Sequence, residues 1–141
     1  REPERAIREY AAVAAYQPDD PWPHQQIAAI YEGIENWTLR SVALQEALVR
    51  SPVKGMIAYQ LALSEWKLGH LGNAIQGMEF ASGAPDLSRD EQLNARFFLA
   101  GFHSDNGHPE IAVRVLRALL AEEPSFAPAR AFLERLERNK Q

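Results

Sequence analysis

Four histidines are the candidates for acid–base chemistry near neutral pH, because the chain has no cysteine. They are His24, His70, His103 and His108. No two of them have the four-residue spacing of a helical metal-binding pair, and none lies in a catalytic motif. We therefore expect structural or solvated roles for them, no catalysis, no metal and no cofactor.

Acidic residues gather beside prolines at two places, where they favour helix capping over catalysis. Neither place has the spaced oxygen ligands and central glycine of a calcium loop. The glycines are equally unpromising for phosphate binding, because no strand precedes them and the loop lysine is absent. The acidic residues are Asp19 and Asp20 before Pro21, and Asp86, Asp90 and Glu91 after Pro85.

The composition is that of one ordinary folded domain. Of 141 residues, 46% are hydrophobic and 24% are charged. The net charge of -4, with dispersed basic residues, argues against a nucleic-acid partner held by a basic face. No apolar run is long enough for membrane insertion, and residues 1–4 are no signal-peptide start. The localisation stays open, since cytoplasm and periplasm are both compatible with this composition.

Residues 55–86 predict two short antiparallel helices joined at Gly69. Apolar residues recur every three to four positions in each half, which gives each helix one apolar stripe. Gly69 is suited to the positive φ that often ends a helix. The stripe residues are Ile57, Ala58, Leu61, Ala62 and Trp66, then Leu71, Ala74, Ile75, Met78 and Ala81.

The alternation of bulky and small residues in this hairpin resembles a tetratricopeptide repeat (TPR). A shift of 34 residues toward the N-terminus carries Leu61, Ala62 and Met78 to Ile27, Ala28 and Leu44, with a closing proline at Pro52. It also places Glu35 at the position of Gly69 and Arg40 at that of Ala74, which departs from the family pattern. A second shift reaches Ala6, Ile7, Tyr10 and Val13 before Pro18. A shift of 38 toward the C-terminus reaches Leu99, Ala100, Gly107, Ala112, Val113, Leu116, Leu119 and Pro124.

The resemblance implies an all-α, right-handed superhelical solenoid of antiparallel helix pairs. Its expected units are the second helix of a truncated repeat (1–18), repeat 1 (19–52), repeat 2 (53–86), repeat 3 with a four-residue insertion (87–124) and a C-terminal capping helix (125–141). The start inside a repeat, without an initiator Met, predicts a piece of a longer protein. A mature end left by processing is the alternative. The unpaired first helix also favours self-association.

Three pairs of residues predict where helices begin. Asp20 with Pro21 and Ser51 with Pro52 are cap-and-proline signals, and Ser88 with Glu91 fits a capping box. Gly77, inside a helix, indicates close approach of a neighbouring helix.

In the TPR family, the first helix of each repeat lines a concave groove that holds partner segments. The resemblance therefore implies a non-catalytic protein-interaction module with a protein or peptide partner. Tyr59, Trp66 and Phe97 suggest a binding surface, and packing against neighbouring helices is the alternative. The expected ligand is an apolar or mixed segment whose direction is set by charges in the groove. The candidate groove residues are Trp22, Gln25, Glu32, Met56, Tyr59, Leu63, Trp66, Lys67, Phe97 and Asp105.

Two other functions fit the same sequence. In the first alternative, the chain is a structural or assembly domain of a bacterial cell-envelope export or secretion machine. In the second, it is the regulatory arm of an enzyme whose catalytic domain lies outside this chain. A lipid-attachment cysteine or barrel strands in the flanks would favour the former, and a catalytic domain the latter.

Overall fold

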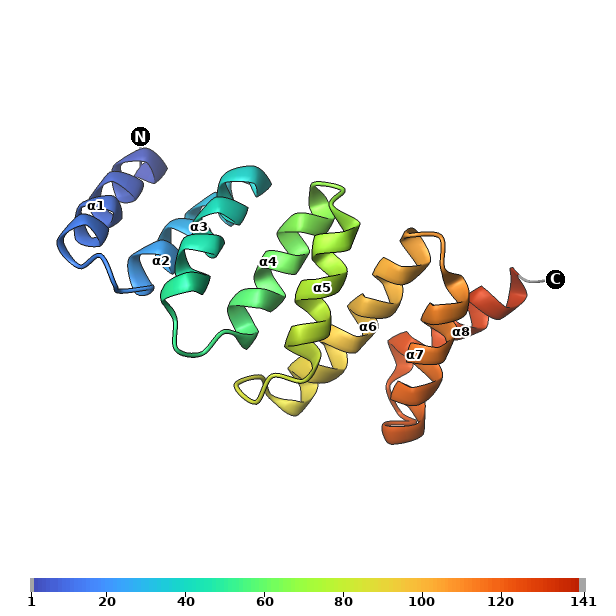
Figure 1. Cartoon of the computed structure of the whole chain (residues 1–141). Coiled ribbons are helices and arrows are strands. Elements are labelled where there is room, and N and C mark those ends of the chain that lie inside the picture. Colours follow the sequence, from blue (N-terminus) through green and yellow to red (C-terminus); the bar gives the residue numbers. More distant parts are fainter. Residues whose placement is uncertain (1, 140–141) are drawn as a thin grey trace.

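The computed structural model describes residues 2–139, and predictions that concern residues 1, 140 and 141 lie outside the described residues. Within that range the chain forms eight α-helices and no strand (Figure 1). The helices are α1 (Glu2–Tyr16), α2 (Trp22–Gly33), α3 (Trp37–Arg50), α4 (Gly55–Lys67), α5 (Leu71–Ser82), α6 (Arg89–Asp105), α7 (Pro109–Glu122) and α8 (Ala127–Arg138).

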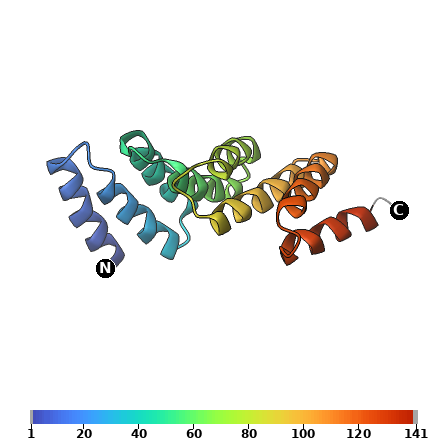
Figure 2. The same cartoon turned by 90° about the horizontal axis from the view of Figure 1, so that it is seen from below.

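Successive helices pack against one another in chain order, so the array grows along one direction. The main helix–helix contacts join consecutive helices, from α1 with α2 to α7 with α8. Helices α3, α5 and α7 lie in front in Figure 1 and form the upper layer in Figure 2. This arrangement confirms the predicted all-α solenoid of helix pairs.

The core consists of the positions that the repeat pattern predicts to be packed. Small residues such as Ala74, Ala81 and Ala112 are fully buried, because they allow the backbones of neighbouring helices to approach. Larger residues at the matching positions, including Leu44 and Leu116, fill the remaining space. In α1 no residue is fully buried, since this helix packs mainly on α2.

The turns that end α2, α4 and α6 share one backbone conformation. Gly69 and Gly107 have φ values of +81° and +82°, as expected for a glycine helix stop. Glu35, at the matching position, has φ 56°. The same hydrogen bond closes each turn, with donor-to-acceptor distances of 2.8 to 2.9 Å. The turn therefore keeps the repeat geometry at Glu35, although its side chain departs from the pattern.

We expect Glu35→Gly to stabilise the chain by about 0.5 to 1 kcal/mol, because glycine adopts a positive φ without steric strain. The measurement is urea denaturation followed by circular dichroism. Gly69→Ala is the matched control. No other side chain lies near its new methyl group, so only the backbone strain should lower the stability. A loss of stability in Glu35→Gly would contradict this reading of the turn.

Of the three predicted helix starts, one agrees with the structure in part and one in full. The Trp22 amide donates to the Asp20 carboxylate at 2.9 Å, and α2 begins at Trp22, one residue after the predicted Pro21. Ser88 and Glu91 form the predicted capping box, with bonds of 2.8 and 3.1 Å.

The predicted cap at Ser51 is wrong. Ser51 lies four residues before Gly55 and its hydroxyl bonds the backbone of Val53 instead. The first amides of α4, those of Gly55 and Met56, donate to the two oxygens of Asp86 at 3.1 Å each. A carboxylate from the α5–α6 loop thus caps α4 across the helix pair.

Gly77 lies where α5 crosses α4. A methyl group there would be 3.1 Å from the Ala62 side chain and 3.3 Å from the Ala58 carbonyl oxygen. The predicted close approach is confirmed.

Candidate functional site

The candidate site is the face of the array that α2, α4, α6 and α8 present, which we call the groove face. One hollow, the polar hollow, lies between α2 and α4 and has a volume of about 300 Å³. Another, the aromatic hollow, lies between α4, α6 and α8 and measures about 350 Å³. Six of the ten predicted groove residues line these hollows. They are Gln25, Glu32 and Met56 in the polar hollow, and Trp66, Phe97 and Asp105 in the aromatic hollow.

A buried arginine from the second layer lines the polar hollow. Arg40 of α3 is only 5% exposed and extends toward α4, where Nη1 donates to the Ser64 hydroxyl at 3.0 Å and to the Gln60 carbonyl at 3.4 Å. Its Nη2 lies 3.7 Å from Oε1 of Glu32, beyond hydrogen-bond distance. Within the part of the chain that the structure describes, Arg40 Nε has no hydrogen-bond partner.

Burial is the main influence on the ionisation of Arg40. It lowers the pKa of the guanidinium, and the carboxylate of Glu32 opposes that shift. An arginine nevertheless keeps its positive charge at neutral pH. The polar hollow therefore contains a fixed cation at its base.

The aromatic hollow is built from rings that also hold neighbouring helices together. Trp66 packs against Phe102 with ring centroids 5.7 Å apart, and its indole N–H donates to Asp105 at 3.1 Å. Phe97 contacts Phe126 and Phe132 at 6.1 and 6.0 Å. This bond and these contacts hold α4, α6 and α8 in register along the groove face.

Tyr59 and Lys67 contact residues of the aromatic hollow without lining it. The Tyr59 ring meets Phe98 edge-on at 6.1 Å, and burial, followed by the charge of Glu91, raises the pKa of its hydroxyl. The Lys67 ammonium lies 5.5 Å from the Trp37 ring and 5.3 Å from the Trp66 ring. Two cation–π contacts thus hold this lysine beside the groove face.

Trp22 and Leu63 lie outside both hollows. Trp22 is 48% exposed and packs edge-on against Tyr10 of α1 at 5.5 Å. Leu63 packs against the core cluster centred on α5. Leu63 shares that cluster with Met56, Tyr59 and Trp66, whereas Trp22 lies apart on α2 beside α1.

Tyr59, Trp66 and Phe97, which suggested a binding surface, are less exposed than a free surface requires. All three are half-buried and pack against the core clusters. Neighbouring helices in the array come close enough for large rings to reach across. The alternative of helix packing therefore holds for part of each ring, while Trp66 and Phe97 also line the aromatic hollow.

Sequence reasoning missed Arg40 and the contribution of α8. Arg40 had a visible signal, namely a charged residue at a position where the repeat pattern has a small one. Helix α8 was expected only to cap the array, but Phe132, Arg135 and Leu136 line the aromatic hollow. Its pattern of exposed charged residues masked that role.

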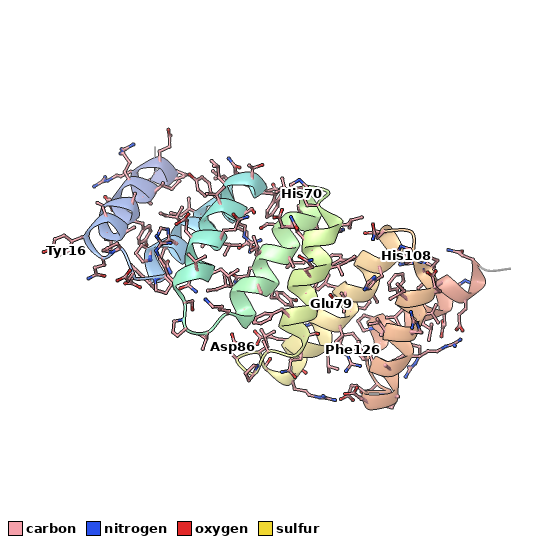
Figure 3. All side chains as sticks on the ribbon, in the orientation of Figure 1. Tyr16, His70, Glu79, Asp86, His108 and Phe126 are labelled. Carbon is pink, nitrogen blue, oxygen red and sulfur yellow. The ribbon has the colours of Figure 1, made fainter. Side chains whose placement is uncertain are left out.

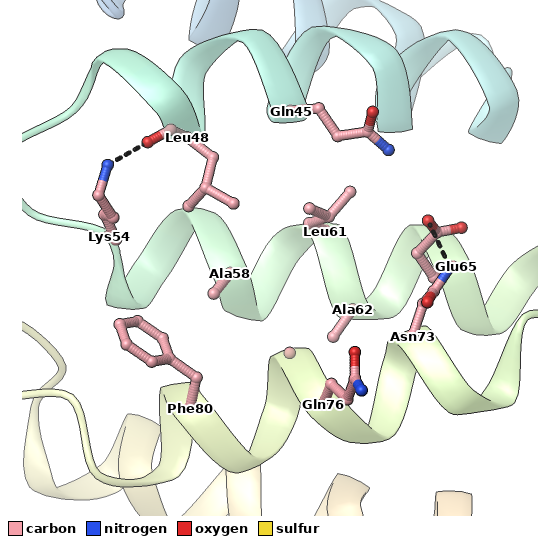
Figure 4. Close-up of a pocket in the computed structure, with 11 residues that line it drawn as sticks. Gln45, Leu48, Lys54, Ala58, Leu61, Ala62, Glu65, Asn73, Gln76 and Phe80 are labelled. Atoms are coloured by element: carbon pink, nitrogen blue, oxygen red, sulfur yellow. Dashed lines mark hydrogen bonds between the residues drawn. The ribbon is translucent and has the colours of Figure 1, made fainter.

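The opposite face also has a hollow, between α3 and α5, with a volume of about 470 Å³ (Figure 4). Leu48 and Leu61 line it and Phe80, 55% exposed, stands at one end. None of the predicted groove residues belongs to it.

None of the four histidines is among the residues that line these hollows. His70 and His108 follow the turns after α4 and α6 (Figure 3) and face Glu65 at 2.8 Å and Glu110 at 3.2 Å. Burial and the nearby Arg50 lower the pKa of His24. Among residues 2–139 no three metal-binding side chains gather at one point. None of the described helices is long and apolar enough to cross a membrane.

The stacked helix pairs and the groove face define a helical-repeat solenoid. No family model and no curated protein matches the chain. Among solved structures, the crystal structure of MamA protein aligns with 99% of this chain and 74% of its own, at 16% identity and a TM-score of 0.83. MamA 41-end from Desulfovibrio magneticus RS-1 covers 98% and 76% at 17% identity and a TM-score of 0.81.

YrrB, described as a TPR protein with an unusual peptide-binding site, aligns with 99% of this chain and 70% of its own. The identity is 19% and the TM-score is 0.81. At these identities the likeness concerns the fold. The chain has the tetratricopeptide repeat fold, as the resemblance implied.

Proposed function

We propose that this chain is a non-catalytic protein-interaction module that binds a segment of a partner protein along the groove face. The observation that carries the proposal is the pair of hollows of different chemistry on one face. Both are open to solvent and lined by helices that the core holds in fixed positions. A site of this kind binds side chains of a peptide in separate pockets.

The aromatic hollow suits an apolar side chain. Phe97, Phe98 and Phe132 supply ring surface, and burial of one aliphatic or aromatic side chain against them stabilises a complex. Asp105 and Arg135 add opposite charges at the same hollow. They would orient polar groups of the segment beside the buried side chain.

The polar hollow suits hydrogen-bonding groups. The side chains of Gln25 and Gln60 line it and can pair with backbone amides and carbonyls of an extended segment. A mixed segment, apolar at one end and polar at the other, therefore fits the groove face best. The peptide-binding site named for YrrB, which has the same fold, supports this proposal.

Gly101 offers a way to block the aromatic hollow without disturbing the core. It lines the hollow, and no neighbouring atom lies within 4 Å of a methyl group added there. We expect Gly101→Phe to fill the hollow and to weaken binding of peptides selected from a displayed random library at least tenfold, about 1.4 kcal/mol. Fluorescence anisotropy with the labelled peptides measures the affinity.

Gly72→Phe is the matched control, because Gly72 lies on α5, outside both hollows, and also has no neighbour within 4 Å. Its affinity should equal that of the parent chain. If Gly101→Phe binds the selected peptides as tightly as the parent chain does, these peptides do not use the aromatic hollow, and the proposal that one segment occupies both hollows of the groove face is wrong.

A further inference from the structure

We propose that the polar hollow binds the carboxylate of an aspartate or glutamate side chain of the partner segment, through the edge of Arg40 formed by Nε and Nη2. The inference rests on the proposed function, because the carboxylate belongs to the segment that occupies the groove face. The inference specifies that one residue of the partner segment is acidic and that Arg40 binds it.

The hydrogen bonds of Arg40 leave one edge of the guanidinium unpaired. Nη1 is occupied by Ser64 and Gln60 of α4. The N–H groups of Nε and Nη2 point the same way and match the two oxygens of a carboxylate. Nε has no partner among the described residues, and Nη2 has only the distant contact with Glu32. A carboxylate would supply both missing bonds.

The burial of Arg40 makes this unpaired edge significant. A buried charge or donor without a partner is unfavourable, and native structures seldom retain one without a reason. The side chain of Arg40 is 6% exposed, so water satisfies little of it. A ligand that displaces Glu32 and pairs with this edge would remove this penalty upon binding.

Glu32 indicates what kind of carboxylate fits. Its side chain, 57% exposed, starts at the end of α2, lines the same hollow and brings Oε1 to 3.7 Å from Nη2. A carboxylate on a short flexible arm therefore reaches Arg40 from the groove face. A partner side chain of the same type would approach in the same way and displace Glu32.

The test uses N-acetyl-glutamate N-methylamide, a model of a glutamate within a peptide, and follows the Nε–H resonance of Arg40 by NMR. We expect a saturable shift with a dissociation constant on the order of 1 to 10 mM. In Glu32→Gln, which lacks the internal competitor, the affinity should rise at least threefold. The uncharged N-acetyl-glutamine N-methylamide should produce no saturable shift.

Arg40→Lys keeps the charge and removes the paired donors, so its binding of the probe, followed by backbone amide shifts, should fall at least fivefold. Circular dichroism establishes that this variant is folded. Binding of the glutamine analogue as tightly as the glutamate probe would overturn the proposal. The proposal would also be overturned if the glutamate probe left the Nε–H resonance of Arg40 unshifted in Glu32→Gln. Tighter binding of N-acetylglycine, a model of a chain terminus, would overturn the assignment to a side chain.

The library peptides separate this inference from the proposed function. If Gly101→Phe weakens their binding while Arg40→Lys and exchange of acidic residues in the peptides leave it unchanged, the groove face binds peptides and the carboxylate site is wrong. If Gly101→Phe leaves the affinity of the peptides unchanged while the probe still shifts the Arg40 resonance, the carboxylate site stands, but the aromatic hollow does not bind the peptides and the proposed function is wrong.

Discussion

Ala112→Arg is expected to unfold at least α6 to α8, with a loss of about 4 kcal/mol or more in the free energy of unfolding. Ala112 is fully buried on α7, in a cluster that also includes Leu116 of the same helix and Ala129 of α8. An arginine there must separate the helices and bring a charge into an apolar core. Far-ultraviolet circular dichroism with urea denaturation measures the loss.

The solenoid predicts where this damage stops. Each helix pair contacts only its neighbours, so unfolding at α7 need not spread through α2 to α5 at once. Hydrogen exchange should show fast exchange in α6 to α8 before the rest. Ala118→Arg, at an exposed position of the same helix, is the control and should change stability by less than about 0.5 kcal/mol. Similar stability for both variants would contradict the assigned core.

Gly55→Ala is expected to destabilise the chain by about 2 to 3 kcal/mol through a steric clash at the start of α4. The added methyl group would lie 2.3 Å from Oδ1 of Asp86 and 2.4 Å from the side chain of Ala84. The α5–α6 loop must move to relieve this clash, which breaks the two bonds that cap α4. Thermal and urea denaturation measure the effect.

A double-mutant cycle identifies the cause of the loss. Asp86→Ala alone should cost about 1 to 2 kcal/mol, as loss of a helix cap does. Gly55→Ala in the Asp86→Ala background should then cost less than in the parent chain, because one clashing group is gone. Gly72→Ala is the control with open space around it and should stabilise slightly. Additive effects at Gly55 and Asp86 would show that the two residues do not interact.

The aromatic residues of the groove face illustrate how far the sequence could lead. The repeat pattern assigned Trp66, Phe97 and Asp105 to one face, and they line one hollow. The pattern did not predict that the rings also pack between helices, because ring contacts depend on the distance between successive helix pairs. Trp66 and Asp105 are 39 residues apart, and no local signal links them.

The sequence by itself determined the helices, their order and their packed faces. Apolar spacing, glycine turns and the Ser88–Glu91 capping box act within a few residues, so they are visible without coordinates. Only the tertiary structure decided that Asp86 caps α4 and that Arg40 lies at the polar hollow with one edge unpaired. The physical reason is that these hydrogen bonds join residues 20 to 31 positions apart, and the angle and spacing of packed helices determine them.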